Sequence, residues 1–252
     1  MPVIEKVIDE TPYIRTFVLD RTFRANPGQY VMVWVRGVDE VPMSLSYENA
    51  ITVQKVGDAT SAMFGLGKGD RLGVRGPYGN GFTLTGRSIL VIAGGVGAAP
   101  LASLAELAHS SGISVTTLLG ARTKTELLFA ERFRQAGELR IATDDGSFGH
   151  AGFVTQLLER TDLSDFDGIY TCGPEQMMAR ILNIVKDSML DRIQLSLHRY
   201  IKCGFGICGA CCIDPEGLRV CADGPVFTGI RLANSEFGKY RRNECGMKVH
   251  VQ

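Results

Sequence analysis

The sequence predicts several domains that combine antiparallel β structure with α/β structure. In residues 1–86, short apolar runs are separated by turn residues, which favours a small antiparallel β-barrel. In residues 87–195, apolar strands alternate with helical segments, which favours a parallel sheet with crossover helices. Residues 196–252 contain closely spaced cysteines and form the third expected domain, which is small.

The composition limits the possible functions. The chain has 252 residues and no net charge, so it is not expected to bind nucleic acid or a membrane surface. No stretch approaches the roughly 18 apolar residues that span a bilayer, and the first residues lack the apolar core of a signal peptide. We therefore expect a cytoplasmic protein.

The barrel is expected from short apolar runs bounded by glycine, proline and aspartate. The expected strands span residues 16–19, 30–35, 51–56 and 71–74, and no helix of any length is expected between them. The segment 76–82 packs three glycines and a proline into seven residues. On composition alone, it is equally an ordinary sharp loop at a domain boundary.

The second domain begins with a continuous apolar run, as in a buried parallel strand. Further strands are expected at 114–119, 139–143 and 168–172. Helices are expected at 101–109, 127–135 and 153–159, and a last one runs from Pro174 to about Met189. The first strand, 88–93, leads directly into the glycine-rich segment 94–100.

Glycine loops follow two of these strands. The loop at 94–100 lies between a strand and a helix, where free N–H groups and the helix dipole favour a phosphate. It lacks the G-x-G-x-x-G spacing, so a plain strand-to-helix turn is the alternative. Cys172-Gly173-Pro174 ends another strand. Both loops are expected at the same edge of the sheet, where they can line one nucleotide cleft.

Four cysteines near the C-terminus have the spacing C-x4-C-x2-C followed by a fourth. They are Cys203, Cys208, Cys211 and Cys221. This is the spacing of plant-type ferredoxins, which hold a [2Fe–2S] cluster on four thiolates. Gly204, Gly206 and Gly209 lie between them and allow the positive φ of a tight loop.

Other interpretations of the cysteines remain open. A structural zinc site usually pairs two C-x2-C units or adds histidines, and a disulfide framework suits a secreted chain. Cys245 is an alternative ligand, whereas Cys212 directly follows a ligand and is expected to point away. Cys172 lies near the expected nicotinamide site or is a small buried residue.

Taken in order, these segments resemble the ferredoxin-NADP reductase superfamily. Within it, the chain is most similar to the electron-transfer subunits of type B dihydroorotate dehydrogenases, and the similarity covers almost the whole chain. The motifs that carry the resemblance are Pro27-Gly28-Gln29-Tyr30, Pro42-Met43-Ser44-Leu45-Ser46, Gly76-Pro77-Tyr78-Gly79-Asn80-Gly81-Phe82, the loop 94–100, Cys172-Gly173-Pro174-Glu175-Gln176-Met177, the four cysteines and Val220-Cys221-Ala222-Asp223-Gly224-Pro225-Val226-Phe227.

The resemblance implies cofactor sites for FAD, NAD and a [2Fe–2S] cluster. The residues implied to run along the flavin are Pro42, Met43 and Ser44. The residues implied to approach its pyrophosphate are Gly57, Thr60 and Ser61. Gly76 and Gly79 are implied to pass close to the flavin. The residues implied to frame the nicotinamide nucleotide are Gly95, Gly97, Pro100, Cys172, Gly173 and Pro174. The implied cluster ligands are the four cysteines, and no side chain is implied to act as a catalytic acid or base.

The sequence departs from the family at the flavin strand. The family usually has an Arg before Pro42 and an aromatic residue after it, whereas this chain has Val41 and Met43. An Arg pairs well with phosphate and an aromatic ring stacks on flavin. Arg75 or Arg71 is a candidate substitute for the missing cation.

The coenzyme is not fixed by the residues alone. Arg122 and Lys124 follow the second strand, where a cation meets the 2′-phosphate of NADP, but they equally suit a solvated loop. The resemblance implies NAD.

The implied function is electron transfer between NAD(H), FAD and the cluster, to or from an FMN-containing catalytic subunit of dihydroorotate dehydrogenase in pyrimidine biosynthesis. The implied assembly is a heterotetramer, with the loop 201–212 facing the catalytic subunit through Ile201, Phe205 and Ile207. One alternative is a related reductase subunit that serves a sulfide dehydrogenase, a hydrogenase or a ferredoxin oxidoreductase. Another is a zinc-stabilised nucleotide-binding regulator without redox activity.

Overall fold

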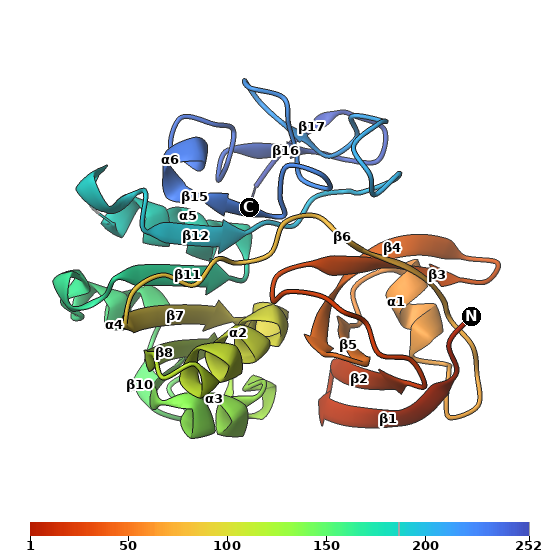
Figure 1. Ribbon diagram of the computed structural model, residues 1–252, viewed down its shortest axis with the longest axis horizontal. Helices are drawn as coiled ribbons and strands as arrows, with labels where there is room; N and C mark the ends of the chain where they lie inside the picture. Colours follow the sequence, from red (N-terminus) through yellow and green to blue (C-terminus); the bar gives the residue numbers. More distant parts are fainter. Residues whose placement is uncertain (186, 252) are drawn as a thin grey trace.

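The computed structural model describes residues 1–185 and 187–251. Lys186, within the expected second domain and its last helix, and Gln252, at the end of the expected third domain, lie outside the described residues. Figure 1 shows a barrel formed by the first part of the chain, an α/β layer beside it, and the C-terminal part lying across both. Among the helices of residues 1–185 and 187–251, none is long and apolar enough to cross a membrane.

The first six strands form one antiparallel sheet in the order β1-β2-β5-β4-β3-β6. The sheet curls on itself, because the Ile4 N–H donates to the Asp70 carbonyl next to β6 and closes the barrel. The strands are β1 (Ile4–Thr11), β2 (Ile14–Leu19), β3 (Tyr30–Val35), β4 (Asp39–Tyr47), β5 (Ala50–Gln54) and β6 (Gly73–Tyr78).

The expectation of no helix in this part was wrong. Helix α1 (Asp58–Met63) follows β5, and it is too short to give a helical period in the sequence. Its start is fixed by Thr60, whose Oγ1 accepts hydrogen bonds from the N–H groups of Val56 and Gly57. Strands β1 and β4 were also not expected, because charged residues such as Glu5, Lys6 and Glu40 interrupt their apolar pattern.

The second sheet has the order β10-β9-β8-β7-β11-β12-β15 and is parallel except for its last strand. Its strands are β7 (Ser88–Gly94), β8 (Ser114–Ala121), β9 (Glu138–Thr143), β10 (His150–Ala151), β11 (Gly168–Cys172), β12 (Ile193–Ser196) and β15 (Val226–Thr228). Strand β15 comes from the C-terminal part of the chain, so the expected third domain contributes a strand to the sheet of the second.

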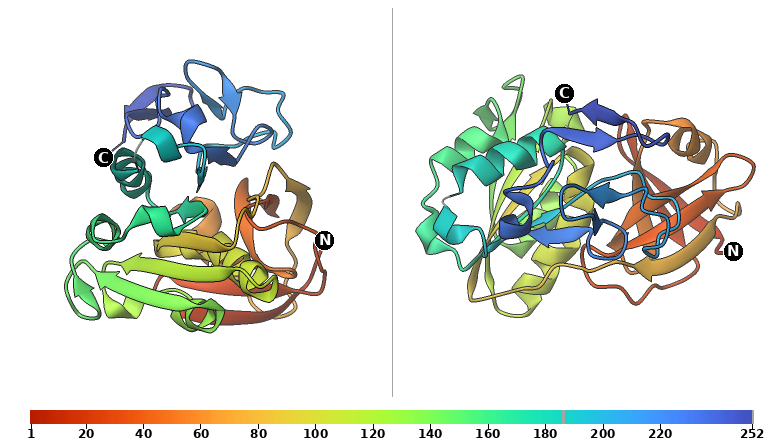
Figure 2. Two further views of the ribbon diagram at one scale, coloured as in Figure 1. Left: turned by 60° about the vertical axis from the view of Figure 1, so that its left-hand side comes forward. Right: turned by 90° about the horizontal axis from the view of Figure 1, so that it is seen from above.

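Helices cover both faces of this sheet, as Figure 2 shows. Ile89 and Val91 of β7 pack in one core with α2 and α3, whereas Leu90 and Ile92 pack in another with α4 and α5. The helices are α2 (Ala98–Ser110), α3 (Ala130–Ala136), α4 (Val154–Glu159) and α5 (Glu175–Ile184). Helix α5 ends before the expected Met189, which lies in a separate 3₁₀ turn, Asp187–Met189.

The C-terminal part contains little regular structure. Its elements are β13 (Cys212–Ile213), β14 (Leu218–Arg219), α6 (Gly229–Leu232), β16 (Tyr240–Arg242) and β17 (Lys248–His250). Its buried residues pack with the second domain, because the same buried cluster as α4 and α5 contains Ile201, Ile213, Val220 and Phe237. The cysteine loop is therefore anchored on the α/β layer.

Candidate functional site

The loop that carries three of the four cysteines is shaped by glycines. Gly204, Gly206 and Gly209 have φ values of +84°, +85° and +73°, as the sequence predicted. Non-glycine residues rarely adopt this conformation. The loop can therefore turn tightly enough to bring several thiols to one place.

The four cysteines lie on two neighbouring segments. The Val220 N–H donates to the Cys211 carbonyl at 3.2 Å, so the Cys221 segment lies beside the third cysteine of the loop. Backbone N–H groups also point at the sulfurs, at N···Sγ distances of 3.2 Å from Gly206 to Cys221 and 3.4 Å from Cys221 to Cys211. Four cysteines on adjacent segments, with N–H donors to their sulfurs, fit a [2Fe–2S] cluster, which takes four thiolates.

The four thiols are not drawn together around one point. Within residues 1–185 and 187–251, no three His, Cys, Asp or Glu side chains gather as they would around a metal ion. All seven cysteines are free thiols.

The loop also alters the acidity of the thiols. Burial opposes ionisation of Cys203, but N–H donors from Cys208, Phe205 and Ile207 outweigh it and lower the pKa of Cys203 to about 6. Burial, followed by the hydrogen bond with Cys211, raises the pKa of Cys221 to about 12. One thiol of the set is therefore preorganised for ionisation, whereas Cys221 lies deeper.

The apolar residues of this loop differ in exposure. Phe205 and Ile207 expose 55% and 78% of their surface, whereas Ile201 is buried in the core. Ile201 therefore cannot offer its side chain to a partner. Cys245, the alternative ligand, lies exposed in the turn between β16 and β17.

The barrel holds the cysteine loop through backbone carbonyls. The hydroxyl of Tyr30 donates to the carbonyls of Gly204 and Cys221, with O···O distances of 3.0 and 3.2 Å. The side-chain amide of Asn80 donates to the carbonyls of Ala222 and Asp223, at 3.2 and 3.1 Å. These bonds join β3 and the loop after β6 to both cysteine-bearing segments.

Of the two expected flavin-loop glycines, Gly79 meets the cluster domain. A Cβ added to Gly79 would lie 2.5 Å from the Gly224 carbonyl oxygen and 2.7 Å from Cδ of Pro225. Gly76 has φ +122° and is exposed. The motifs 76–82 and 220–227 therefore pack against one another, and Gly79 is explained by that contact.

The expected flavin strand is β4, and its residues lie on two faces. Ser44 pairs with Tyr30 of β3, and Pro42 pairs with Met32, so these side chains share the face that meets the cysteine loop. Met43 packs against the barrel core together with Val41. The structure thus brings Pro42 and Ser44, but not Met43, to the side of the cluster.

The expected pyrophosphate residues lie at the start of α1. Gly57 has open space around it and Ser61 is exposed, whereas Thr60 is buried and its hydroxyl is occupied by the backbone. The candidate cation Arg75 lies elsewhere. Its guanidinium forms a two-fold salt bridge with Glu40, at 2.7 Å, and donates to the Cys203 carbonyl at 2.8 Å. Arg71 donates to the Met1 carbonyl.

The two nucleotide loops lie together, as the sequence predicted. Strands β7 and β11 pair in parallel, with Ala93 opposite Cys172, so both loops leave the same edge of the sheet. A Cβ on Gly97 would collide with the backbone of Cys172, and one on Gly173 would lie 2.5 Å from Met177.

The residues of the two nucleotide loops differ in their exposure to solvent. Gly95 has φ +53° and open space, and Pro174 is exposed. Pro100 is buried in the first turn of α2. Burial raises the pKa of the Cys172 thiol to about 12, so this thiol stays protonated.

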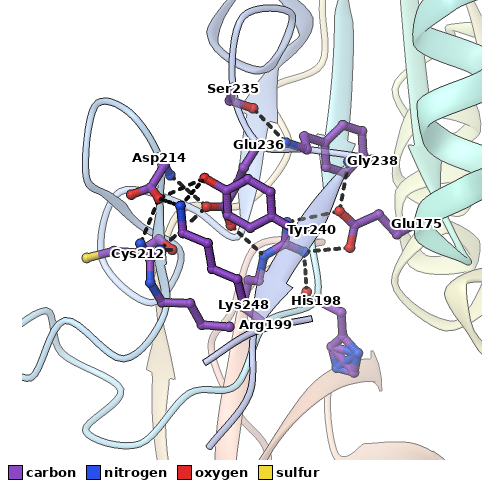
Figure 3. Close-up of polar contacts among 12 residues, drawn as sticks. Glu175, His198, Arg199, Cys212, Asp214, Ser235, Glu236, Gly238, Tyr240 and Lys248 are labelled. Carbon is purple, nitrogen blue, oxygen red and sulfur yellow. Dashed lines mark hydrogen bonds and ion pairs between the residues drawn. The ribbon is translucent and has the colours of Figure 1, made fainter. Parts of the chain in front are cut away.

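A charge network that is buried at one end and partly exposed at the other joins the nucleotide loop to the cluster domain (Figure 3). We call it the charged joint, and it consists of Glu175, Arg199, Glu236, Arg242 and Asp214. Arg199 donates to both carboxylate oxygens of Glu175 at 2.8 and 3.0 Å, and its Nε lies 3.7 Å from Glu236. Arg242 binds Asp214 at 2.7 Å and Glu236 at 3.5 Å. Glu175 is the first residue of α5, directly after Pro174.

The cations considered for coenzyme choice have nearby partners. Lys124 lies over the ring of Phe148 at 5.3 Å, and Arg122 lies near Asp144, whose pKa is raised by burial and lowered by that cation. Both contacts suit the solvated loop that the sequence left open for these residues.

Sequence reasoning missed the residues that join the parts. Tyr30 and Asn80 were recognised only as members of motifs, and Arg75 was assigned to phosphate. Their contacts bridge more than 120 positions of sequence, so no local pattern reveals them. The available signal was the presence of Tyr30 in the Pro-Gly-Gln-Tyr motif before a strand.

Comparisons with known proteins agree with this organisation. Residues 198–233 match the iron-sulfur cluster binding domain of dihydroorotate dehydrogenase B, and residues 91–182 match an oxidoreductase NAD-binding domain. A solved structure of the NADH-dependent reduced ferredoxin-NADP oxidoreductase has a TM-score of 0.81 at 28% identity and covers 91% of this chain and 88% of its own. Phthalate dioxygenase reductase, at 21% identity and a TM-score of 0.64, covers 77% of this chain and 66% of its own and shows the fold alone.

Relatives match along nearly the whole length. A protein of Methanocella arvoryzae is 58% identical over 98% of this chain and 97% of its own, and one of Methanocaldococcus jannaschii is 48% identical over 98% and 96%. Both are described as the probable electron transfer subunit of dihydroorotate dehydrogenase B (NAD(+)). This chain belongs to the family of dihydroorotate dehydrogenase B electron transfer subunits.

Proposed function

We propose that this chain passes electrons between NAD(H), FAD and a [2Fe–2S] cluster, to or from the catalytic subunit of a dihydroorotate dehydrogenase. The observation that carries the proposal is the set of four cysteines on adjacent segments, with N–H donors to their sulfurs, in a loop that is hydrogen-bonded to the barrel beside β4. Family membership over 98% of the chain supports the same function.

Each cofactor has a set of residues that would hold it. Cys203, Cys208, Cys211 and Cys221 would hold the cluster. Pro42, Ser44 and the start of α1 would hold FAD, with Met43 supporting β4 from the barrel side. The loops 94–100 and 172–174 would hold NAD. When bound, these groups supply hydride transfer and one-electron chemistry, whereas the protein supplies position and electrostatics.

The side chains near the site act by placement. Burial raises the pKa of the Cys172 thiol, so this thiol is uncharged at neutral pH. Gly97 lets the two nucleotide loops touch, and Gly79 lets the cluster domain approach the barrel. The proposal therefore assigns no residue as a catalytic acid or base.

The proposed partner is an FMN-containing catalytic subunit, in a heterotetramer with two copies of each chain. Phe205 and Ile207 are the proposed contact residues, because they are apolar, exposed and next to the cluster ligands. The proposal includes a cytoplasmic location, a compartment in which seven free thiols stay reduced.

A matched pair of cysteine variants tests this function. The protein is purified anaerobically with its catalytic subunit, and NADH-dependent reduction of orotate and the electron paramagnetic resonance of the reduced cluster are measured. Cys211→Ser should lose the cluster signal and orotate reduction, whereas the neighbouring Cys212→Ser should keep both. The ligand set would be refuted if Cys212→Ser lost the cluster signal and orotate reduction while Cys211→Ser kept both.

A second candidate is a subunit of an NADH-dependent ferredoxin oxidoreductase. The solved structure with a TM-score of 0.81 favours it, since it matches 91% of this chain. The two candidates differ in the acceptor. NADH-dependent reduction of ferredoxin, without reduction of orotate in the presence of the catalytic subunit, would select the second.

A further inference from the structure

One face of β3 belongs to the barrel and the other to the cluster domain. Val31 and Val33 pack in the barrel core, whereas Tyr30 and Met32 belong to the buried cluster that contains Cys211 and Cys221. Successive side chains of a strand point to opposite faces. Strand β3 is thus the wall between the barrel interior and the cysteine loop.

Tyr30 connects the two cysteine-bearing segments through one hydroxyl. Its ring is 3% exposed, and the carbonyls that accept from it belong to Gly204, next to the ligand Cys203, and to the ligand Cys221 itself. These two carbonyls are separated by 17 positions in sequence. A donor shared between them fixes the spacing of the loop and the Cys221 turn.

Arg75 reaches the same loop from β6. Its Nη1 donates to the Cys203 carbonyl at 2.8 Å, while Nε and Nη2 bind the carboxylate of Glu40 on β4. The guanidinium also lies 5.9 Å from the ring centre of Phe205. The barrel therefore presents donors to the carbonyls of Cys203, Gly204 and Cys221, and one of these donors is a cation paired with a carboxylate.

The same face carries the proposed flavin residues. Ser44 lies directly opposite Tyr30 on the neighbouring strand. Neighbouring strands lie about 4.8 Å apart, and directly opposite side chains share a face. The residue that grips the cysteine loop is thus adjacent to the strand that would hold FAD.

Positive charge, and the positive end of a donor dipole, favour the reduced, more negative state of a nearby cluster and raise its reduction potential. Tyr30 and Arg75 bring such donors to the carbonyls of the ligand segments, not to the sulfurs themselves. We propose that Tyr30 and Arg75 are positioning residues that fix the cluster loop beside β4 and raise the reduction potential of the cluster, with Glu40 offsetting the charge of Arg75. The proposal rests on the proposed function, since it assumes a cluster on the four cysteines.

The test is a redox titration of the cluster in the purified complex, followed by electron paramagnetic resonance. Tyr30→Phe should lower the midpoint potential by about 59 mV, which is a tenfold change in a one-electron equilibrium constant. Glu40→Gln should move the potential in the opposite direction, because it leaves the charge of Arg75 without its partner. Glu40 is partly exposed, so this variant is expected to fold.

Tyr170→Phe is the matched control. Tyr170 is also buried, and its hydroxyl donates to the Thr83 carbonyl at 2.9 Å and accepts from the Thr85 N–H at 3.0 Å, in the α/β layer. The Tyr170→Phe variant should lose stability, as Tyr30→Phe does, but its cluster should keep the midpoint potential of the wild type. Wild-type potentials in both Tyr30→Phe and Glu40→Gln would overturn the inference.

The outcomes separate this inference from the proposed function. If the wild-type complex shows no cluster that NADH reduces, the proposed function fails. If the wild-type cluster is reduced by NADH and the potentials of Tyr30→Phe and Glu40→Gln are unchanged, only the role of Tyr30 and Arg75 fails.

Discussion

The cluster domain is held on two sides by different chemistry. Toward α5 it is held by the charged joint, in which Arg199, Glu175 and Glu236 are buried. Toward the barrel it is held by what we call the barrel joint, which consists of Tyr30, Arg75, Gly79 and Asn80 and acts mainly on backbone carbonyls. The charged joint touches the first residue after the nucleotide loop, whereas the barrel joint touches the cysteine-bearing segments.

The two joints are expected to tolerate different changes. A buried ion pair is strongly destabilising when one partner is removed, because the other charge stays buried without compensation. A joint built on backbone carbonyls depends on shape and on individual hydrogen bonds. Charge removal should therefore disrupt the first, and added volume should disrupt the second.

The largest effect is expected from Arg199→Met in the charged joint. It leaves the carboxylate of Glu175 buried without its cation and leaves Glu236 with Arg242, at 3.5 Å, as its remaining cation, which should cost about 3–5 kcal/mol. The measurement is urea unfolding of the anaerobically purified protein. Arg180→Met is the control, because the exposed pair of Arg180 and Glu159 should contribute at most about 1 kcal/mol. Equal losses in the two variants would contradict the role of the charged joint.

A smaller effect is expected from Gly79→Ala in the barrel joint. The added methyl group would meet the Gly224 carbonyl and Pro225, and such overpacking together with the positive φ should cost about 3 kcal/mol. Gly37→Ala is the control for backbone strain alone, since Gly37 has φ +77° and no atom within 4 Å of an added Cβ. Unfolding and iron content should differ between the variants, and matching values would show that the close approach is unimportant.

The smallest effect is expected from pH at the outer end of the charged joint. Hydrogen bonds from Arg242 and then Tyr240 hold the pKa of Asp214 below its ordinary value of 3.8. A carboxyl whose pKa is lower in the folded protein than in the unfolded chain stabilises the fold at pH values above its unfolded pKa. This stabilisation is lost as the pH falls through the folded pKa. Asp214→Asn should be slightly less stable than the wild type at neutral pH, and the gap should close in acid. Unfolding curves across this range test it, and a gap that widens in acid would count against it.

Glu236 is expected to act with the opposite sign. Burial raises its pKa above the ordinary value of 4.5, although the Asp214 N–H and the charges of Arg199 and Arg242 oppose the shift. Its contribution is therefore full below pH 4.5 and declines as the pH rises through the folded pKa. The two ends of the charged joint thus respond to pH in opposite directions.

The strand β7, the start of α2 and the cysteine loop were predictable because each is determined by a short stretch of sequence. The continuous apolar run 88–93 and the glycine loop after it became β7 and the start of α2, because a buried parallel strand and its turn are both visible in sequence. The cysteine spacing and the positive φ of Gly204, Gly206 and Gly209 were visible for the same reason.

The joints were not predictable because they depend on distant pairs. Strand β15 pairs with β12 in the second sheet, although the cysteine loop lies between these two strands in the sequence. No periodic pattern in the sequence indicates this pairing. Arg75 looked like a phosphate cation until its partners Glu40 and the Cys203 carbonyl were seen. The role of Arg75 depends on its contacts, and the residues that make these contacts come from distant parts of the chain.

The central claim is that this chain carries electrons on a flavin and a [2Fe–2S] cluster. The most direct measurement is an absorption spectrum of anaerobically purified protein, with iron, acid-labile sulfide, zinc and FAD determined on the same sample. The account predicts two irons, two sulfides and one FAD per chain, with iron and sulfide lost in Cys211→Ser. A colourless protein with one zinc per chain and no flavin would contradict it.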